Sequence, residues 1–258
     1  MDLHLKDKVF IVSGGAKGIG RAICIQLLEE GAVPVLLDKD ETAGNDFVKS
    51  HKRSQFIALD LSDALACQKA IADTSNRFGH IDGVVNNAGY NDGVGLEKGD
   101  PKKFLQSMIS NTGHFYSLVH YALPHLKKVK GSVVNIASKV AITGQGNTSG
   151  YAAAKGAILA LTREWAVELL PYSIRVNAIL PAEVWTPLYE KWISSFENPG
   201  EKKKQIEKMI PLEKRMTTPE EIANMVIMLL SDRSNHITGQ WISVDGGYVH
   251  LDRAIGKH

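Results

Sequence analysis

The sequence predicts a doubly wound α/β fold, in which helices cover both faces of a seven-stranded parallel sheet. Seven short runs rich in Val and Ile show little polar alternation, which is typical of parallel strands buried on both faces. Stretches of helical period separate these runs, and such alternation implies right-handed crossovers within one sheet. The chain has 258 residues, of which 44% are apolar, enough for one large core. We therefore expect residues 1–258 to form a single domain.

The expected elements alternate along the chain. Strands are predicted at residues 9–13, 33–37, 55–59, 83–86, 132–136, 174–179 and 241–244. Helices are predicted at 19–30, 64–78, 101–126, 151–170 and 219–230. The last helix begins with Thr218-Pro219-Glu220-Glu221, a capping box with proline at the first helical position. Residues 183–212 fit neither pattern and carry four aromatic residues and a charged run, so we expect them to form a lid.

Charge and composition exclude several classes of protein. Thirty basic residues balance 28 acidic ones, which disfavours a surface for nucleic acid or anionic membranes. The apolar run at residues 9–12 is too short for a signal-peptide core or a membrane span. Neither the two cysteines nor the nine histidines show a metal-binding or disulfide spacing. We expect a soluble cytoplasmic protein that acts on a small molecule without a metal.

A glycine-rich turn joins the first predicted strand to the first predicted helix. It contains Gly14, Lys17, Gly18, Ile19 and Gly20 in the spacing G-x-x-x-G-x-G. Glycines let the chain turn tightly and let its backbone approach a pyrophosphate at the helix N-terminus. The turn therefore predicts a Rossmann-type dinucleotide site, with a plain structural turn as the alternative.

Asp38 follows the second predicted strand, 18 residues after Gly20. A carboxylate there can accept both hydroxyls of the adenosine ribose and repels a 2′-phosphate, although it could also cap the next helix. Lys17 and Lys39 are close enough in sequence to reach a 2′-phosphate. We predict NAD as the cofactor, with NADP as a weaker one.

Tyr151 and Lys155 are four residues apart on a predicted helix, so their side chains share one face. A nearby ammonium lowers the pKa of a tyrosine and lets it remove a proton from an alcohol. Ser138 follows the strand predicted at 132–136, at the sheet edge where ligands bind in such folds. Its hydroxyl can hold the substrate oxygen. The three residues predict a dehydrogenase.

With these residues in place, the chain resembles the short-chain dehydrogenase/reductase family over about residues 5–252. The resemblance rests on Gly14-x-x-x-Gly18-x-Gly20, Asp60-Leu61, Asn86-Asn87-Ala88-Gly89, Asn111, Ser138, Tyr151-x-x-x-Lys155, Arg175-Val176-Asn177, Pro181 and Asp245-Gly246-Gly247. Two positions depart from the family pattern. Ser13 replaces the usual threonine and keeps its hydroxyl, whereas Ala182 replaces a glycine and restricts the turn before Glu183.

The resemblance also implies roles for residues that spacing alone does not explain. Asp60 and Leu61 would contact the adenine, and Asn87, Ala88 and Gly89 would hold the fold beside the cofactor. Asn111 would anchor a water that links Lys155 to solvent, and Lys155 would also bind the nicotinamide ribose. The segment containing Val184 and Thr186 would contact the carboxamide. Helices 101–126 and 151–170 would form the interface of a homotetramer.

Polar residues surround the expected substrate pocket. They are Asn91, Lys139, Gln145, Asn147, Glu183, Trp185 and Tyr189. Because unpaired buried polar groups are costly, this set favours a polyhydroxylated ligand over a steroid or acyl chain. The alternatives are that Gln145 and Asn147 only stabilise their loop, and that Glu183 is a surface group or pairs with Arg175 or Lys191.

Three stretches of the chain also resemble the bacterial L-fucose dehydrogenases of this family. They are Ser138–Tyr151, Pro181–Tyr189 and Gly247–Arg253. The resemblance implies oxidation of the anomeric carbon of L-fucose, L-galactose or D-arabinose to a lactone. It places His250 or Asp252 near a pocket, although the tail could equally fasten the last strand.

Two other functions remain open from sequence. A family member that acts on an apolar alcohol or ketone, of the hydroxysteroid or 3-oxoacyl type, would use the same catalytic residues. A dinucleotide-sensing protein without catalysis would not need Ser138, Tyr151 and Lys155 together.

Overall fold

The computed structural model describes residues 1–251, and Asp252 lies outside the described residues. Seven strands form one sheet in the order β3-β2-β1-β4-β5-β6-β7, and all neighbouring strands are parallel. The strands are β1 (Val9–Ser13), β2 (Val33–Asp38), β3 (Gln55–Ala58), β4 (Gly83–Asn86), β5 (Ser132–Ile136), β6 (Arg175–Pro181) and β7 (Trp241–Val244). The predicted doubly wound sheet is confirmed.

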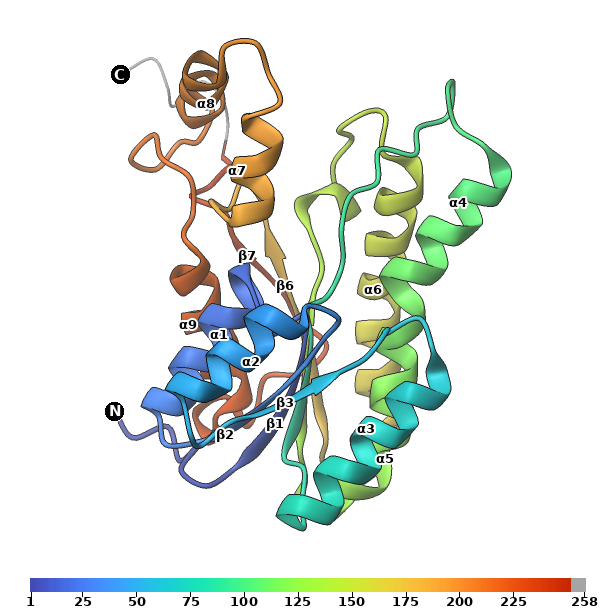
Figure 1. Ribbon diagram of the computed structural model, residues 1–258, viewed down its shortest axis with the longest axis vertical. Helices are drawn as coiled ribbons and strands as arrows, with labels where there is room; N and C mark the ends of the chain where they lie inside the picture. Colours follow the sequence, from blue (N-terminus) through green and yellow to red (C-terminus); the bar gives the residue numbers. More distant parts are fainter. Residues whose placement is uncertain (252–258) are drawn as a thin grey trace.

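Helices cover both faces of the sheet, which Figure 1 shows nearly edge-on. One face carries α1 (Gly18–Glu29), α2 (Glu41–Ser50) and α9 (Pro219–Leu230). The other carries α3 (Ala64–Phe78), α4 (Pro101–Met108), α5 (His114–Val129) and α6 (Ser149–Glu168). Each layer buries its own apolar cluster, one with Ile23, Leu27 and Phe47, the other with Phe115 and Leu118. Within residues 1–251 there are also three short 3₁₀ helices, at Lys139–Ala141, Leu170–Tyr172 and Asp232–Ser234.

Side-chain caps mark where most of these helices begin. Asp40 accepts the backbone N–H of Ala43 and starts α2, a helix that the sequence pattern did not predict. Thr218 and Glu221 form the predicted capping box of α9. Helix α1 has no side-chain cap, because Lys17 at its N-cap position makes no side-chain hydrogen bond to the helix. The first N–H groups of α1 therefore lack an intrachain cap.

The helix predicted at 101–126 is interrupted. A π-helical segment, Ile109–Gly113, separates α4 from α5. The Asn111 side chain stabilises it, since Nδ2 donates to Ser107 O at 3.0 Å and Oδ1 accepts the Tyr90 N–H at 2.9 Å. Such segments insert one residue per turn and often occur at functional sites.

The lid expected at 183–212 contains two helices, α7 (Pro187–Ile193) and α8 (Pro199–Lys208). Helix α7 begins behind Thr186, whose hydroxyl accepts the Tyr189 N–H, and proline occupies its first turn. Figure 1 places both helices beyond the carboxyl ends of β6 and β7. Within residues 1–251, no helix has the length and apolar character needed to cross a membrane.

Candidate functional site

The glycine turn is packed so closely that side chains are excluded from it. Gly14 and Gly18 have φ of 65° and 53°, in the left-handed region that favours glycine. A Cβ on Gly20 would lie 2.1 Å from Gly14 O and 2.7 Å from Asn87 Nδ2. Asn87 Nδ2 also donates to Gly14 O at 3.2 Å and to Ser13 O at 3.0 Å. The turn forms a cradle that at Gly20 has no room for a side chain, and at Gly14 the packing and the backbone conformation both favour glycine.

The Ser13 hydroxyl joins this cradle to the loop after β4. Its oxygen accepts the N–H groups of Asn87 at 2.9 Å and Ala88 at 3.1 Å. These bonds connect β1 to β4, the neighbours at which the strand order reverses. Ligands in such sheets bind at that switch point. Serine therefore makes the contacts for which a threonine hydroxyl is expected in the family.

Asp38 lies at the end of β2 and is held by two backbone groups. Its carboxylate accepts the N–H of Ala16 at 3.1 Å and of Asp40 at 3.1 Å. Lys17 forms an ion pair with Asp40, so one of the two lysines considered for a 2′-phosphate is already engaged. Lys39 is exposed.

Asp60 and Leu61 follow β3 along the same sheet edge. Asp60 accepts the N–H and the hydroxyl of Ser62, at 2.9 and 2.8 Å, and these two bonds lower the pKa of its carboxyl. Leu61 is half-buried.

Residues 184–186 return from β6 to the glycine turn. Val184 is buried and pairs with Thr217 in an isolated parallel bridge. A Cβ on Gly18 would touch the Thr186 side chain at 3.5 Å. Thr186 therefore lies beside the turn. The cradle, the uncapped start of α1 and the Asp38 carboxylate together fit a dinucleotide, whose phosphates need N–H donors and whose ribose needs an acceptor.

Ser138, Tyr151 and Lys155 come together at the carboxyl end of β5. Lys155 is buried, and its Nζ donates to Ile136 O at 2.7 Å and lies 5.5 Å from the centre of the Tyr151 ring. Burial lowers the pKa of Lys155 to about 7. Burial raises the pKa of Tyr151 to about 12, against a hydrogen bond with Ser138 that lowers it. Before a ligand arrives, the phenol is protonated at neutral pH.

Asn111 and Lys155 border one small space beside Gly89. A Cβ on Gly89 would lie 3.1 Å from Asn111 Oδ1 and 3.4 Å from Lys155 Nζ. Because Gly89 has no side chain, the space between Asn111 Oδ1 and Lys155 Nζ is not filled from this position.

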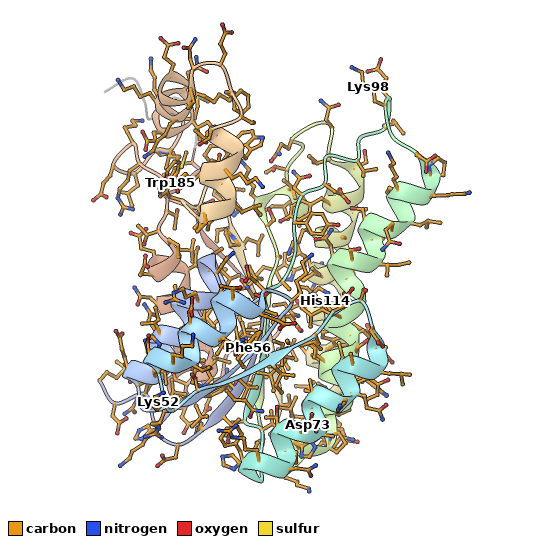
Figure 2. All side chains as sticks on the ribbon, viewed as in Figure 1. Lys52, Phe56, Asp73, Lys98, His114 and Trp185 are labelled. Carbon is orange, nitrogen blue, oxygen red and sulfur yellow. The ribbon has the colours of Figure 1, made fainter. Side chains whose placement is uncertain are left out.

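His114 adjoins these residues and was missed in the sequence. It lies on the inner side of α5 (Figure 2), with Nε2 3.2 Å from Ala88 O. Burial and the charge of Lys155 lower its pKa to about 4, so the ring is neutral at pH 7. Its place three residues after Asn111, on the same helical face, is the signal that could have indicated it.

The residues predicted to bind substrate divide into two groups. Glu183, Trp185 and Tyr189 pack together: Glu183 is ion-paired with Lys139 and accepts the Tyr189 hydroxyl at 2.5 Å, and the two aromatic rings lie 6.4 Å apart. Asn91, Gln145 and Asn147 are exposed. Asn147 has φ of 55° and packs its backbone against Gly95, which favours a role in the loop.

The partners suggested for Glu183, Arg175 and Lys191, were wrong. Arg175 starts β6, at the opposite edge of the sheet, and donates to Leu229 O at 2.6 Å and Ser234 Oγ at 2.9 Å. Lys139 is the partner instead, because it directly follows Ser138 at the edge where Glu183 follows β6. His250 lies 3.5 Å from Ser243 in β7, a contact that fits fastening of the last strand.

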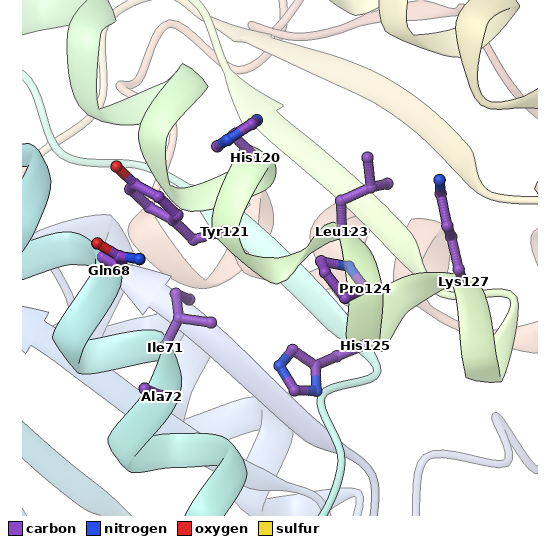
Figure 3. A pocket seen from close by; sticks show the side chains of 9 residues that line it. All are labelled: Gln68, Ile71, Ala72, His120, Tyr121, Leu123, Pro124, His125 and Lys127. Carbon is purple, nitrogen blue, oxygen red and sulfur yellow. The ribbon is translucent and has the colours of Figure 1, made fainter.

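A separate hollow lies between α3 and α5, with a volume of about 610 Å³ (Figure 3). Its lining includes Ile71, Tyr121 and His125 and none of the predicted site residues. Among the described residues, no three histidine, cysteine or acidic side chains are grouped as metal ligands.

Comparison with known proteins identifies the family. Residues 14–249 match the family described as enoyl-(acyl carrier protein) reductase. The L-fucose dehydrogenase of Mus musculus is 37% identical over 93% of this chain and 88% of its own length. The levodione reductase of Leifsonia aquatica is 34% identical over 93% of this chain and 94% of its own. The crystal structure of Cj0485 dehydrogenase has a TM-score of 0.95 at 44% identity, covering 98% of both chains.

The fold and the site thus define an oxidoreductase that acts on alcohol or ketone groups of a small molecule. The chain belongs to the short-chain dehydrogenase/reductase family, as its resemblance predicted. Members of this family generally use NAD(P) and are often oligomeric.

Proposed function

We propose that this protein is an NAD-dependent sugar dehydrogenase that oxidises the anomeric carbon of L-fucose, L-galactose or D-arabinose to the lactone. The observation that carries the proposal is the position of the Lys139–Glu183 ion pair, directly beside Ser138 at the sheet edge. A polyhydroxylated substrate can use the remaining hydrogen-bonding capacity of these two charged groups, whereas an apolar substrate would cover it without supplying a partner. The similarity to L-fucose dehydrogenases supports the same substrate class.

Each residue of the site has a role in this reaction. NAD, when bound, supplies the hydride acceptor. The Ser138 hydroxyl holds the oxygen of the anomeric hydroxyl group. Tyr151 removes the proton of that hydroxyl group as the hydride leaves the anomeric carbon. In its protonated form Lys155 stabilises the tyrosinate through its positive charge, which opposes the effect of burial on the pKa of Tyr151. Asn111 holds the water through which Lys155 exchanges its proton with solvent, and neutral His114 positions the backbone at Ala88.

The remaining proposed contacts follow the cofactor along the sheet edge. Gly14, Lys17, Gly18, Ile19 and Gly20 enclose the pyrophosphate, and Asp38 binds the adenosine ribose. The adenine meets Asp60 and Leu61, the segment Asn87–Gly89 borders the cofactor, and Val184 and Thr186 contact the carboxamide. NAD is favoured over NADP because Asp38 repels a 2′-phosphate and Lys17 is paired with Asp40. A cytoplasmic location accords with the two free cysteines.

Reduction of an apolar ketone is the second candidate function. It is favoured by the levodione reductase relative. It would use the same Ser138, Tyr151 and Lys155.

Initial rates decide between these functions. L-fucose, L-galactose, D-arabinose and a steroid alcohol are each assayed with NAD and with NADP, following the absorbance of the reduced nicotinamide. We expect turnover of a sugar with NAD to exceed every other combination. Faster turnover of the steroid alcohol would overturn the sugar assignment, and turnover only with NADP would overturn the role of Asp38.

Tyr151→Phe tests the mechanism in the same assay. Loss of the phenol should lower kcat by roughly 10²- to 10⁴-fold, while cofactor binding, followed by quenching of tryptophan fluorescence, stays within about twofold. Tyr172→Phe, at an exposed tyrosine of the 3₁₀ helix after α6, is the matched control and should retain full activity. Full activity in Tyr151→Phe would exclude this tyrosine as the base.

A further inference from the structure

Four side chains from three distant segments form a cluster beside Ser138. Lys139 follows β5, Glu183 and Tyr189 come from the segment after β6, and Tyr248 follows β7. Lys139 Nζ contacts Glu183 and lies 4.2 Å from the centre of the Tyr248 ring, and the Tyr189 hydroxyl donates to the other Glu183 oxygen. Because β5, β6 and β7 are adjacent, their carboxyl ends bring these residues together.

Stability alone does not account for this cluster. The Lys139 and Glu183 side chains are only 10% and 12% exposed, so both charges have lost most of their water. A buried ion pair often stabilises a protein less than two apolar side chains of the same volume would. Its presence at the edge of the proposed site therefore points to a ligand.

The hydrogen-bonding capacity of the cluster defines the ligand chemistry. Each carboxylate oxygen of Glu183 can accept a further hydrogen bond, and the Lys139 ammonium has three donors, of which Glu183 takes one. The Tyr189 hydroxyl remains protonated, since burial and the Glu183 charge raise its pKa. Acceptors and a donor thus lie side by side. Adjacent hydroxyls of a pyranose ring, each both donor and acceptor, match this arrangement.

We infer that Lys139, Glu183, Tyr189 and Tyr248 form the specificity cluster of this enzyme: Glu183 and Lys139 bind two adjacent ring hydroxyls of the substrate, Tyr189 orients Glu183, and Tyr248 covers Lys139. This inference rests on the proposed sugar dehydrogenase activity. It assigns selectivity for sugars over apolar alcohols to the Lys139–Glu183 charge pair.

The test removes both charges at once. In Lys139→Met/Glu183→Leu no unpaired charge remains buried, so the variant should fold, as checked by its thermal unfolding. We expect kcat/KM for L-fucose to fall on the order of 100-fold, the ratio of sugar turnover to steroid-alcohol turnover to fall with it, and the affinity for NAD to stay unchanged. Tyr189→Phe, which removes one hydroxyl, provides a second test, with an expected rise in the KM for L-fucose of about 10-fold.

A matched control uses another lysine–carboxylate pair. Lys8 and Asp232 are 2.9 Å apart at the amino end of β1, far from the site edge, and Lys8→Met/Asp232→Asn should keep the selectivity of the wild type. Sugar selectivity unchanged in both folded cluster variants would overturn the inference and leave the proposed function intact. Absence of sugar turnover in the wild type would overturn the proposed function and, with it, the inference.

Discussion

Lys155 illustrates how burial changes the pKa of a single side chain. Its ammonium is enclosed by protein and donates to the Ile136 carbonyl, and its pKa is lowered to about 7. In the unfolded chain the same group binds a proton up to about pH 10.5. Between these values the unfolded state binds more protons than the folded state. The folded state is therefore favoured as pH rises.

Lys155→Met makes this effect measurable. Below pH 7 wild-type Lys155 is charged and buried, and this cost is progressively relieved as pH rises toward 9. The free energy of unfolding of the wild type, relative to Lys155→Met, should therefore increase between pH 7 and 9, by up to about 1.4 kcal/mol per pH unit. Urea unfolding of both proteins measures it. A difference independent of pH would contradict the burial of a titrating lysine. The range stops at pH 9 because the unfolded chain also loses protons from Cys24 and Cys67 around that pH, the ordinary pKa of a thiol being 9.0.

Sequence spacing predicted the site residues that lie together in one short motif. It missed contacts between residues that come from distant segments of the chain. Tyr151 and Lys155 share a helical face because of their four-residue separation. The Lys139–Glu183 pair joins residues 44 positions apart, and no local pattern encodes that distance. From the sequence Arg175 was an alternative partner for Glu183, but it lies at the start of β6, at the opposite edge of the sheet.

At the scale of elements, the connection from β1 to α1 depends on a close backbone contact. A Cβ on Gly20 would meet Gly14 O at 2.1 Å, and neither backbone can move without displacing the turn. Gly20→Ala should cost roughly 1–3 kcal/mol of stability and weaken cofactor binding at least 10-fold, measured by thermal unfolding and by fluorescence titration.

Gly200→Ala provides the matched control. Gly200 lies in α8, and an added Cβ there would meet nothing within 4 Å. Because alanine favours helix, this variant should be neutral or more stable by up to about 1 kcal/mol. If Gly20→Ala bound the cofactor as Gly200→Ala does, the turn would not be the phosphate site.

A cap alone did not make a helix predictable from the sequence, since α2 begins at the Asp40 cap and was not predicted. The π-helical segment at Asn111 was not predictable, because it depends on the bond from the Tyr90 N–H, which belongs to the loop after β4. Similarly, α7 and α8 form within a segment expected to be irregular, where the Thr186 cap and two prolines set the helix starts.

At the scale of the whole molecule, apolar side chains remain exposed on the helices expected to form a homotetramer. Leu105 of α4, Tyr116 of α5 and Val167 of α6 are 60%, 56% and 66% exposed. Tyr116 and Trp165 of α6 lie with ring centres 6.4 Å apart, so α5 and α6 present neighbouring surface. Exposed apolar patches of this kind often mark an interface between subunits.

Val167→Glu should therefore prevent the expected tetramer from forming, because a carboxylate buried against a second subunit loses its water without a partner. Light scattering after size-exclusion chromatography measures the mass, and we expect a tetramer for the wild type and a smaller species for Val167→Glu. Leu96→Glu, at a 90% exposed leucine outside the helices, should leave the mass unchanged. A monomeric wild type would exclude the tetramer.

The sequence by itself determined the parallel sheet, its seven strands and the family, because strand periodicity, glycine spacing and the Ser138, Tyr151 and Lys155 motif are local or nearly local signals. The tertiary structure alone decided which charges are paired and which are buried. Lys17 meets Asp40, Lys139 meets Glu183, and His114 lies beside Lys155. These pairings arise where strand ends and loops converge in space, and burial then sets their protonation, so no pattern along the chain could specify them.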